Sequence, residues 1–325
     1  MVFVFLDGVG IGDASADNPL FTASADFLPF YTGNRGLPDG TPVKPIDAML
    51  GVDGIPQSAT GQTSLYTGEN VPALLKEHTG SYPNRPMRKL IKEKNILLRL
   101  RERGVNAMFI NAYPYHSHLF THEFVTILED GSFHFSDGFP PLFKRRMSVT
   151  TCMMIANRLI PFDEIDIMEG NTIYQDYSNS SLIRDVEAAK KAGKLPVGVT
   201  EVKLPRFTPE KAAEILYNVS RKHDFILYEY FQTDIHAHRS PFEERVRLIR
   251  ELNRLMGKLV SLLDKEEDTL LVTSDHGNLE DGSTRSHTRN PVPLVVWGKG
   301  EHELRAGIDS LVDVTPAVLK FFGIR

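Results

Sequence analysis

Short apolar runs alternate with longer amphipathic stretches along this chain. Three runs have the length of strands and are almost wholly apolar: residues 2–6, 224–231 and 268–274. Three longer stretches have helical periodicity together with helix start and stop signals: residues 86–104, 207–223 and 242–263. Continuous apolar strands separated by helices are typical of parallel sheets that are covered on both faces. The pattern therefore predicts an α/β fold, doubly wound around a mostly parallel sheet.

The rhythm of strands and helices is interrupted between residues 111 and 204. Residues 124–137 read as a hairpin with its turn at Asp130 and Gly131. Residues 148–159 and 181–193 read as helices. We interpret residues 111–204 as a smaller α+β cap inserted into a core formed by residues 1–110 and 205–325.

Carboxylates and imidazoles follow three of the predicted strands. Ligands bind at the carboxyl ends of strands in open α/β sheets, where such side chains converge. Carboxylate and imidazole ligands without thiolate suit Mn²⁺ or Zn²⁺. The side chains that fall at these ends, each expected in a loop, are Asp7, Asp234, His238, Asp275, His276 and, eleven residues beyond His276, His287. His236 lies in the same predicted loop as Asp234 and His238. We interpret it either as a residue that supports these ligands or as a histidine without a catalytic role.

A hydroxyl-rich segment, SATGQ at residues 58–62, precedes a run that is expected to be helical from Thr60 to Tyr66. Ser58 is then the N-cap of that helix, or a nucleophile or phosphate ligand at its N-terminus. Thr60 is the rival nucleophile. Residues 13–54 are expected to be mostly loop, with one short helix over residues 23–30.

Composition excludes several classes of function. The formal net charge is −5 and the pI is about 6.1, which argues against a nucleic-acid-binding protein. Cys152 is the only cysteine, so neither an internal disulfide nor a cysteine zinc site is expected. The apolar opening is too short for a membrane span and lacks a signal peptide's cleavage pattern, so we expect a cytoplasmic protein. A dinucleotide site after the first strand is disfavoured, because Asp13 stands where the fingerprint requires glycine.

Taken together, four motifs resemble those of the alkaline phosphatase superfamily, most closely the branch of cofactor-independent phosphoglycerate mutase and phosphopentomutase. They are DGVG after the first strand, SATGQ, TDIHAH, and TSDHGNLED followed by SHTRNPVPLVVWG. Gln62 departs from the pattern, because histidine is usual at that position. The resemblance covers residues 1–110 and 205–325 and does not extend to the block between them.

This resemblance implies two divalent metal ions, Mn²⁺ or Zn²⁺. One would be held by Asp7, Ser58, Asp275 and His276, and the other by Asp234, His238 and His287. It implies a phosphomonoester hydrolase or phosphomutase that acts on a small phosphorylated metabolite through a phosphoserine at Ser58. The candidate substrate-binding residues are Arg285, Arg289, Gln62 and Thr60.

Two other kinds of function stay open from the sequence. One is a phosphodiesterase or sulfatase on the same scaffold, although the cysteine motif of the formylglycine sulfatases is absent from the sequence. The other is a catalytically idle scaffold that keeps metals for structure. The role of His116, His118 and His122 is undecided between a further metal site and an exposed loop.

Overall fold

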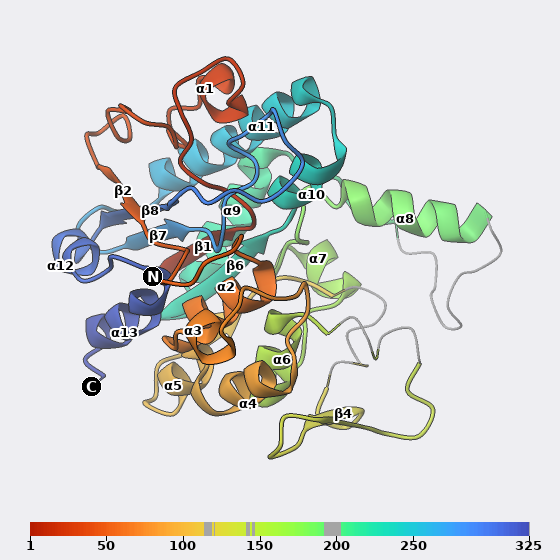
Figure 1. The fold of residues 1–325 in the computed structure, drawn as a ribbon. Helices are drawn as coiled ribbons and strands as arrows, with labels where there is room; N and C mark the ends of the chain where they lie inside the picture. The colour runs from red at the N-terminus through yellow and green to blue at the C-terminus, as the bar shows by residue number, and fades with distance from the viewer. Residues whose placement is uncertain (114–118, 120, 141–143, 145–146, 192–202, 325) are drawn as a thin grey trace.

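A six-stranded sheet forms the centre of the computed structural model, which describes residues 1–113, 119, 121–140, 144, 147–191 and 203–324. Its strand order is β2-β8-β7-β1-β6-β3, and β4 and β5 form a separate hairpin (Figure 1). The strands are β1 (Val2–Leu6), β2 (Val43–Ile46), β3 (Ala107–Phe109), β4 (Val125–Ile127), β5 (Phe133–Phe135), β6 (Phe225–Tyr230), β7 (Thr269–Thr273) and β8 (Val292–Gly298).

The strands of the sheet are mostly parallel, which confirms the predicted fold class. β1 lies between β6 and β7 and pairs with both in parallel, so that Val2 is opposite Ile226 on one side and Leu270 on the other. β3 extends the parallel part beyond β6. β8 runs antiparallel to β7, and β2 runs antiparallel to β8 at the edge. β2 was not predicted, because it is short and begins in a loop-like sequence.

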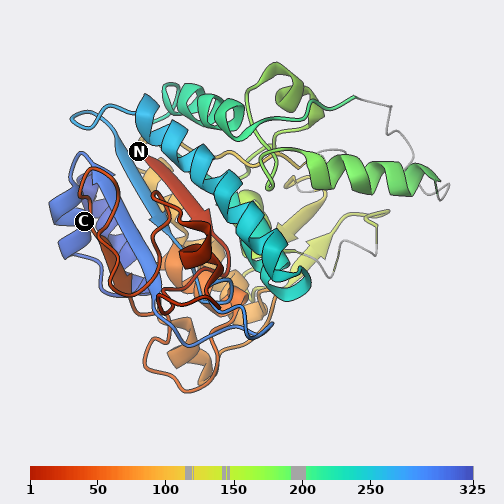
Figure 2. The same cartoon turned by 90° about the horizontal axis from the view of Figure 1, so that it is seen from above.

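Helices cover both faces of the sheet (Figure 2). They are α1 (Pro19–Ala23), α2 (Ser58–Thr67), α3 (Val71–Leu75), α4 (Arg85–Lys94), α5 (Ile96–Arg101), α6 (Val149–Ala156), α7 (Glu164–Glu169), α8 (Ser180–Lys191), α9 (Pro209–Ser220), α10 (Gln232–Arg239), α11 (Phe242–Leu262), α12 (Glu301–Ala306) and α13 (Leu311–Phe321). On one face α9 packs against α11, and on the other α2 packs against α13 and α4.

Strand β1 shows how the sheet divides the core in two. Phe3 and Phe5 pack with residues of α2, α5 and α13 on one face. Val2, Val4 and Leu6 pack with residues of α9 and α11 on the other. Successive side chains of a strand point to opposite faces, so an apolar strand without alternation must be covered on both.

Two predicted local structures were wrong near the candidate site. The segment expected to be a loop after β6 is helix α10, which places Asp234 and His238 one turn apart on one face. No glycine or proline interrupts residues 232–239, so nothing in that segment prevents a helix. The helix expected from Thr60 begins two residues earlier: Gln57 is the N-cap residue of α2, and Ser58 is its first helical residue.

Two other helices differ in their bounds. The helix predicted over residues 86–104 is divided into α4 and α5, because the extended backbone of Asn95 ends the first and its side chain accepts a hydrogen bond from Leu98 N in the second. The helix expected over residues 23–30 is not formed there: a short helix, α1, ends at Ala23, and it begins at Pro19 because Asn18 caps it and Pro19 takes the first position.

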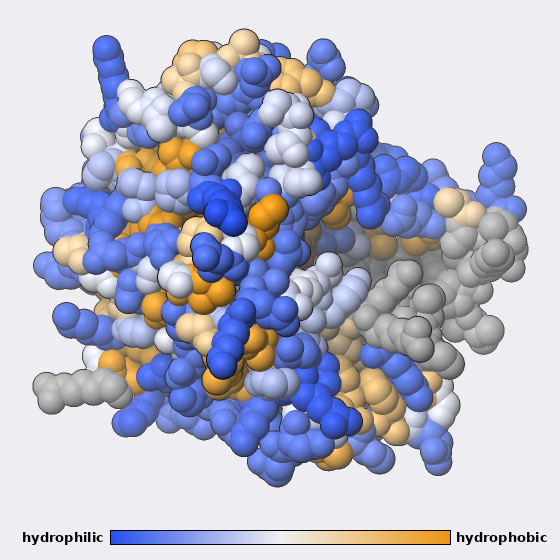
Figure 3. Space-filling view, viewed as in Figure 1, coloured by the Kyte–Doolittle hydropathy of each residue, from blue (hydrophilic) through white to orange (hydrophobic). Residues whose placement is uncertain are grey.

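The block between β3 and α9 contains the β4–β5 hairpin and helices α6 to α8. Helix α6 packs against α4, and Cys152 and Met153 are buried in the core on that side of the sheet. Helix α8 projects away from the body of the molecule in both ribbon views (Figures 1 and 2). The surface is recessed between the body and this arm (Figure 3). The division into residues 1–110 with 205–325 and an inserted cap stays a prediction.

None of the helices in the described ranges combines the length and the apolar character that crossing a bilayer requires.

Candidate metal centre

Three adjacent strands bring the candidate ligands together. Asp7 follows β1, helix α10 with Asp234 follows β6, and Asp275 and His276 follow β7. The order β7-β1-β6 places these three strand ends side by side. Their carboxylates therefore converge on one point above the middle of the sheet.

The first set of side chains surrounds His276 Nε2. This atom lies 3.6 Å from Asp7 Oδ1 and 3.6 Å from Asp275 Oδ2. The Ser58 hydroxyl oxygen lies 3.0 Å from the same nitrogen. Asp275 and His276 are fully buried, whereas Ser58 is partly exposed. The structure thus brings together all four residues of the first predicted ligand set.

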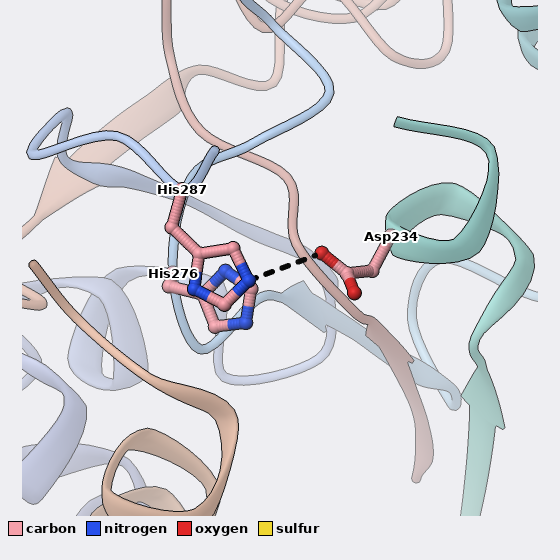
Figure 4. A group of neighbouring side chains, drawn as sticks. All are labelled: Asp234, His276 and His287. Atoms are coloured by element: carbon pink, nitrogen blue, oxygen red, sulfur yellow. Dashed lines mark ion pairs between the residues drawn. The ribbon is translucent and has the colours of Figure 1, made fainter. Parts of the chain in front are cut away.

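The second set lies beside the first. His238 Nε2 is 3.3 Å from Asp234 Oδ2 and 3.1 Å from His287 Nε2, and His287 Nε2 is 3.6 Å from Asp234 Oδ1. The His276 and His287 rings are stacked with their centroids 3.8 Å apart, so the two sets are in direct contact (Figure 4). His276, His287 and Asp234 also present nitrogen and oxygen atoms close enough to one another for a single ion.

Two glycines permit this crowding. Gly8 has a φ of +67°, and a Cβ atom on it would lie 2.5 Å from Asp234 Oδ1. A Cβ atom on Gly61 would lie 2.8 Å from the Asp275 carbonyl oxygen, so the glycine allows α2 to approach the end of β7. Glycine is required where backbone and side chain come this close. The glycine of the DGVG motif therefore makes room for a carboxylate.

The electrostatics of the centre fit cations. Burial raises the pKa of Asp7 well above its usual range, and the neighbouring carboxylates of Asp275, Asp234 and Glu229 raise it further. Asp7 Oδ1 is buried and has no hydrogen-bond partner among the described residues. Burial, followed by the charge of His276, lowers the pKa of His287, which favours the neutral imidazole that a metal requires. A buried carboxylate oxygen without a donor among like charges is well matched to a divalent ion.

Backbone and amide groups hold the candidate ligands in place. His238 Nδ1 contacts the Arg285 carbonyl oxygen at 2.6 Å, and His287 Nδ1 contacts the Pro56 carbonyl oxygen at 2.8 Å. Each contact leaves Nε2 free to face the centre. Gln62 donates from Nε2 to Asp275 Oδ2 at 3.0 Å, and Asn278 donates from Nδ2 to Asp234 Oδ1 at 2.7 Å.

Glu280 is a residue that sequence reasoning missed. It is 2% exposed, and its carboxylate joins the glycine loop after β1 to the loop between β7 and β8. Oε2 accepts hydrogen bonds from Gly10 N and Asn278 N, both at 2.8 Å, and Oε1 accepts from Asn290 Nδ2 at 3.0 Å and from the Thr288 hydroxyl. Glu280 lies in the segment NLED shortly after Asp275 and His276. Nothing in that segment, apart from its closeness to these two residues, indicates a role for the glutamate.

Glu280→Ala is expected to destabilise the fold by about 3 kcal/mol, because it leaves several buried donors without an acceptor. Metal affinity should fall about 10- to 100-fold, since the two loops that carry ligands are no longer tied together. Glu280→Gln retains one acceptor oxygen and should recover much of both losses. Chemical denaturation and Mn²⁺ titration of the three proteins measure this. If the alanine and glutamine variants have the same stability and the same metal affinity, Glu280 does not act as the hydrogen-bond acceptor that joins the two loops.

A second buried carboxylate lies in the sheet behind the centre. Glu229 is completely buried on β6 and accepts hydrogen bonds from the Tyr66 and Thr150 hydroxyls, each at 2.6 Å. Burial, together with the nearby charge of Asp275, raises its pKa to about 7 in spite of these two hydrogen bonds. The side chain connects β6 to α2 and α6.

This pKa predicts a pH dependence of stability. The folded pKa exceeds the unfolded value of 4.5, so the folded state binds the proton more tightly and loses stability as the pH rises through 7. The loss contributed by Glu229 is about 3 kcal/mol. In chelator-treated protein, Glu229→Gln should therefore show a smaller fall in free energy of unfolding between pH 5 and pH 8 than the parent. The exposed Glu267→Gln is the control and should follow the parent. If Glu229→Gln leaves the pH dependence of the free energy of unfolding unchanged, the raised pKa of Glu229 is wrong.

The other predicted site residues lie outside the two candidate ligand sets. Thr60 is fully buried and its hydroxyl donates to the Gln57 carbonyl oxygen at 3.1 Å. Gln62 is 4% exposed and engaged with Asp275. Arg285 and Arg289 are exposed on the loop that carries His287.

The remaining histidines lie elsewhere. His236 is on α10, and both of its ring nitrogens are buried without a hydrogen-bond partner among the described residues. Burial lowers its pKa. His122 is exposed, while His116 and His118 lie outside the described residues.

Comparison with known proteins shows similarity over the part of the chain that carries most of this centre. The sequence profile of the metalloenzyme superfamily matches residues 190–325, which include Asp234, His238 and the whole loop from Asp275 to His287. In solved structures, the fold is similar to alkaline phosphatase from the Antarctic bacterium TAB5, with a TM-score of 0.51, 14% identity, and 98% of this chain and 96% of that chain covered. Residues 190–325 thus match a metalloenzyme superfamily, and the fold of the chain is similar to that of an alkaline phosphatase.

Over part of its length, the chain is similar to 2,3-bisphosphoglycerate-independent phosphoglycerate mutases. The protein of Pseudomonas fluorescens (strain Pf0-1) is 34% identical over 132 residues, which are 38% of this chain and 25% of that protein. The protein of Acetivibrio thermocellus is 33% identical over 124 residues, which are 36% of this chain and 24% of that protein. The chain therefore matches about a quarter of the length of these relatives.

Proposed function

We propose that this protein is a two-metal-dependent phosphoryl-transfer enzyme, a phosphomonoester hydrolase or phosphomutase, that acts on a small phosphorylated metabolite through a phosphoserine at Ser58. The observation that carries the proposal is the position of the Ser58 hydroxyl, 3.0 Å from His276 Nε2 where the two ligand sets meet. Thr60, the rival nucleophile, is buried and hydrogen-bonded within its own helix.

Two divalent ions, Mn²⁺ or Zn²⁺, fit the two sets. Asp7, Ser58, Asp275 and His276 would hold one, and Asp234, His238 and His287 the other. When bound, such ions lower the pKa of a hydroxyl that they contact and neutralise the oxygens of a phosphoryl group. The unpartnered Asp7 Oδ1 and the cluster of carboxylates support this assignment.

Ser58 is suited to attack phosphorus. It is the first residue of α2, so the positive end of the helix dipole favours an anion beside it. In the proposed step, a bond forms between Oγ and phosphorus, the bond to the leaving oxygen breaks, and the serine proton is released towards that oxygen. Water, or a hydroxyl of the acceptor, then takes the phosphoryl group and frees Ser58.

Gln62 has a different role from the predicted contact with substrate. Its amide holds Asp275 Oδ2, so we assign it to positioning that carboxylate and not to contact with substrate. Arg285 and Arg289 flank His287 and are exposed, and they stay our candidates for clamping the phosphate of the substrate.

A screen of purified, Mn²⁺-loaded protein against phosphomonoesters, phosphodiesters and sulfate esters tests the proposal. We expect turnover of phosphomonoesters, either to free phosphate by a hydrolase or to an isomeric ester by a mutase. If the protein turns over only phosphodiesters or only sulfate esters, the proposed substrate class, phosphomonoesters, is wrong. No turnover of any ester by fully loaded protein would favour an idle scaffold.

A further inference from the structure

A fully buried asparagine, Asn278, contacts the second ligand set from the loop that follows β7. Its amide nitrogen lies 2.7 Å from Asp234 Oδ1 and 3.1 Å from His238 Nε2. An ionised carboxylate only accepts hydrogen bonds, so the shorter contact identifies the facing atom as the amide nitrogen and not the amide oxygen. The two N–H groups of this nitrogen are therefore shared between two candidate metal ligands.

The atoms of the two imidazoles that meet in this set are acceptors. His238 Nδ1 contacts the Arg285 carbonyl oxygen at 2.6 Å, so this nitrogen carries the proton of the neutral ring. His287 Nδ1 contacts the Pro56 carbonyl oxygen at 2.8 Å and carries the proton for the same reason. Both Nε2 atoms then present lone pairs, although they lie only 3.1 Å apart.

The carboxylate of Asp234 adds two more acceptors to the same space. Oδ2 lies 3.3 Å from His238 Nε2, and Oδ1 lies 3.6 Å from His287 Nε2. Figure 4 shows Asp234 facing the His287 ring. Lone pairs at these distances repel one another in a partly buried site unless a donor or a cation lies between them. Apart from the imidazoles, Asn278 supplies the side-chain N–H groups that contact this set within the described ranges.

The orientation of the Asn278 amide has a cost. Its Oδ1 atom is buried and has no hydrogen-bond partner among the residues that the structure describes. An unsatisfied buried acceptor is unfavourable, and turning the amide over would place that oxygen against the Asp234 carboxylate instead. The two donor contacts therefore decide the orientation.

The backbone on both sides of the amide is fixed. Asn278 N donates to Glu280 Oε2 at 2.8 Å, and Leu279 N donates to the Gly8 carbonyl oxygen at 2.9 Å. The side chain is thus presented to the ligand set from a loop that is tied to the glycine loop after β1.

We propose that the Asn278 amide stands in for the second ion: in the ion-free protein its two N–H groups hold Asp234 and His238 together, and it gives up the His238 lone pair when the ion binds. This inference rests on the two-ion assignment of the proposed function. Asn278 makes two contacts with the set when the ion is absent and keeps at most the one to Asp234 when the ion is present. It is therefore a positioning residue that stabilises the ion-free state more than the loaded state.

Asn278→Asp tests this role, because it replaces the donor with an acceptor of nearly the same size. In the presence of a chelator, the unfolding temperature should fall by at least about 3 °C, since a third carboxylate group then faces acceptors alone. In a Mn²⁺ titration of the whole chain, one of the two ions should bind at least about tenfold more tightly than in the parent, because the added charge favours a cation.

Asn278→Ala removes both donors without adding a charge, and it tests the proposal by itself if Asn278→Asp does not fold. Its loss of unfolding temperature should be larger with chelator than with saturating Mn²⁺, because the ion takes over the role of the missing donors. An equal loss in both conditions would show that Asn278 only supports the fold, and the proposal would be overturned.

Asn290→Asp is the matched control. Asn290 belongs to the same loop between β7 and β8, and its Nδ2 donates to Glu280 Oε1 at 3.0 Å, but it is not part of either ligand set. This variant should lose unfolding temperature to a similar extent with chelator and with Mn²⁺, and it should gain no affinity for either ion.

The proposal is also overturned if Asn278→Asp binds both ions no more tightly than the parent does, or if the parent binds no second ion. Neither measurement involves turnover. An unchanged affinity in Asn278→Asp therefore leaves the proposed phosphoryl transfer intact, and a loaded protein that turns over no ester leaves the role of Asn278 intact.

Discussion

Ser58→Ala is expected to reduce turnover of the best phosphomonoester by about a thousandfold or more, because removal of a nucleophile removes the covalent route altogether. Metal content should fall only in part, since Asp7, Asp275 and His276 remain to hold that ion. The phosphate adduct should vanish with the activity. Acid quench during turnover, followed by peptide mass spectrometry, places the adduct in the parent on the peptide that contains Ser58.

Thr60→Ala is the matched control for this variant. The Thr60 hydroxyl is buried and donates to the Gln57 carbonyl oxygen, so its loss should slow turnover modestly and leave the adduct in place. An adduct on Thr60 would make Thr60 the nucleophile. Full activity of Ser58→Ala without any adduct would mean that water attacks directly, and the phosphoserine would have to be abandoned.

Asp275→Asn is expected to remove one of two bound ions and nearly all activity. Asp275 is completely buried, lies 3.6 Å from His276 Nε2 and is held by Gln62, so asparagine fits the same space without the charge that a cation requires. Metal analysis after Mn²⁺ or Zn²⁺ reconstitution should give about two ions per chain in the parent and about one in the variant, because each ligand set holds its own ion.

Asp281→Asn controls for a carboxylate in the same loop. Its side chain accepts hydrogen bonds from Ser283 and is not part of either ligand set. This variant should keep both ions and its activity. Two ions retained in Asp275→Asn would show that the assignment of ligands is wrong, as would a parent that binds none.

The sequence was sufficient to predict the central parallel strands β1, β6 and β7, because they are short apolar runs with polar residues at their carboxyl ends. It also predicted that Asp7, Asp234 and Asp275 would lie together, since parallel strands end at one edge. The helical state of residues 232–239 was missed because their polar, histidine-rich composition resembles a loop, and helicity there depends on packing of Thr233 and Ala237 against the core. The assignment of Asp7, Asp234 and Asp275 as metal ligands stays a prediction until bound ions are measured.

The residues that hold the candidate ligands in position could not be predicted from the sequence, for a different reason. Glu280 is identified only by its four donors, which come from Gly10 and from three positions in its own loop. Gln62 looked like a substrate contact because it stands where the superfamily motif has histidine, and only the hydrogen bond to Asp275 reveals its position. Such pairings depend on distances across the fold and leave no periodic trace along the chain.

The arrangement of the centre also constrains the order in which the protein can acquire its ions during synthesis. Asp7 leaves the ribosome well before Asp275, His276 and His287, because Asp275 lies 268 positions further along the chain (275 − 7). Neither ligand set is complete until β7 has paired beside β1 and the following loop has closed. A nascent chain that is shorter than this holds at most isolated carboxylates and histidines, which bind divalent ions weakly. Ion capture therefore has to follow the pairing of β7 with β1, and bound metals would report that this strand and the loop after it are in place.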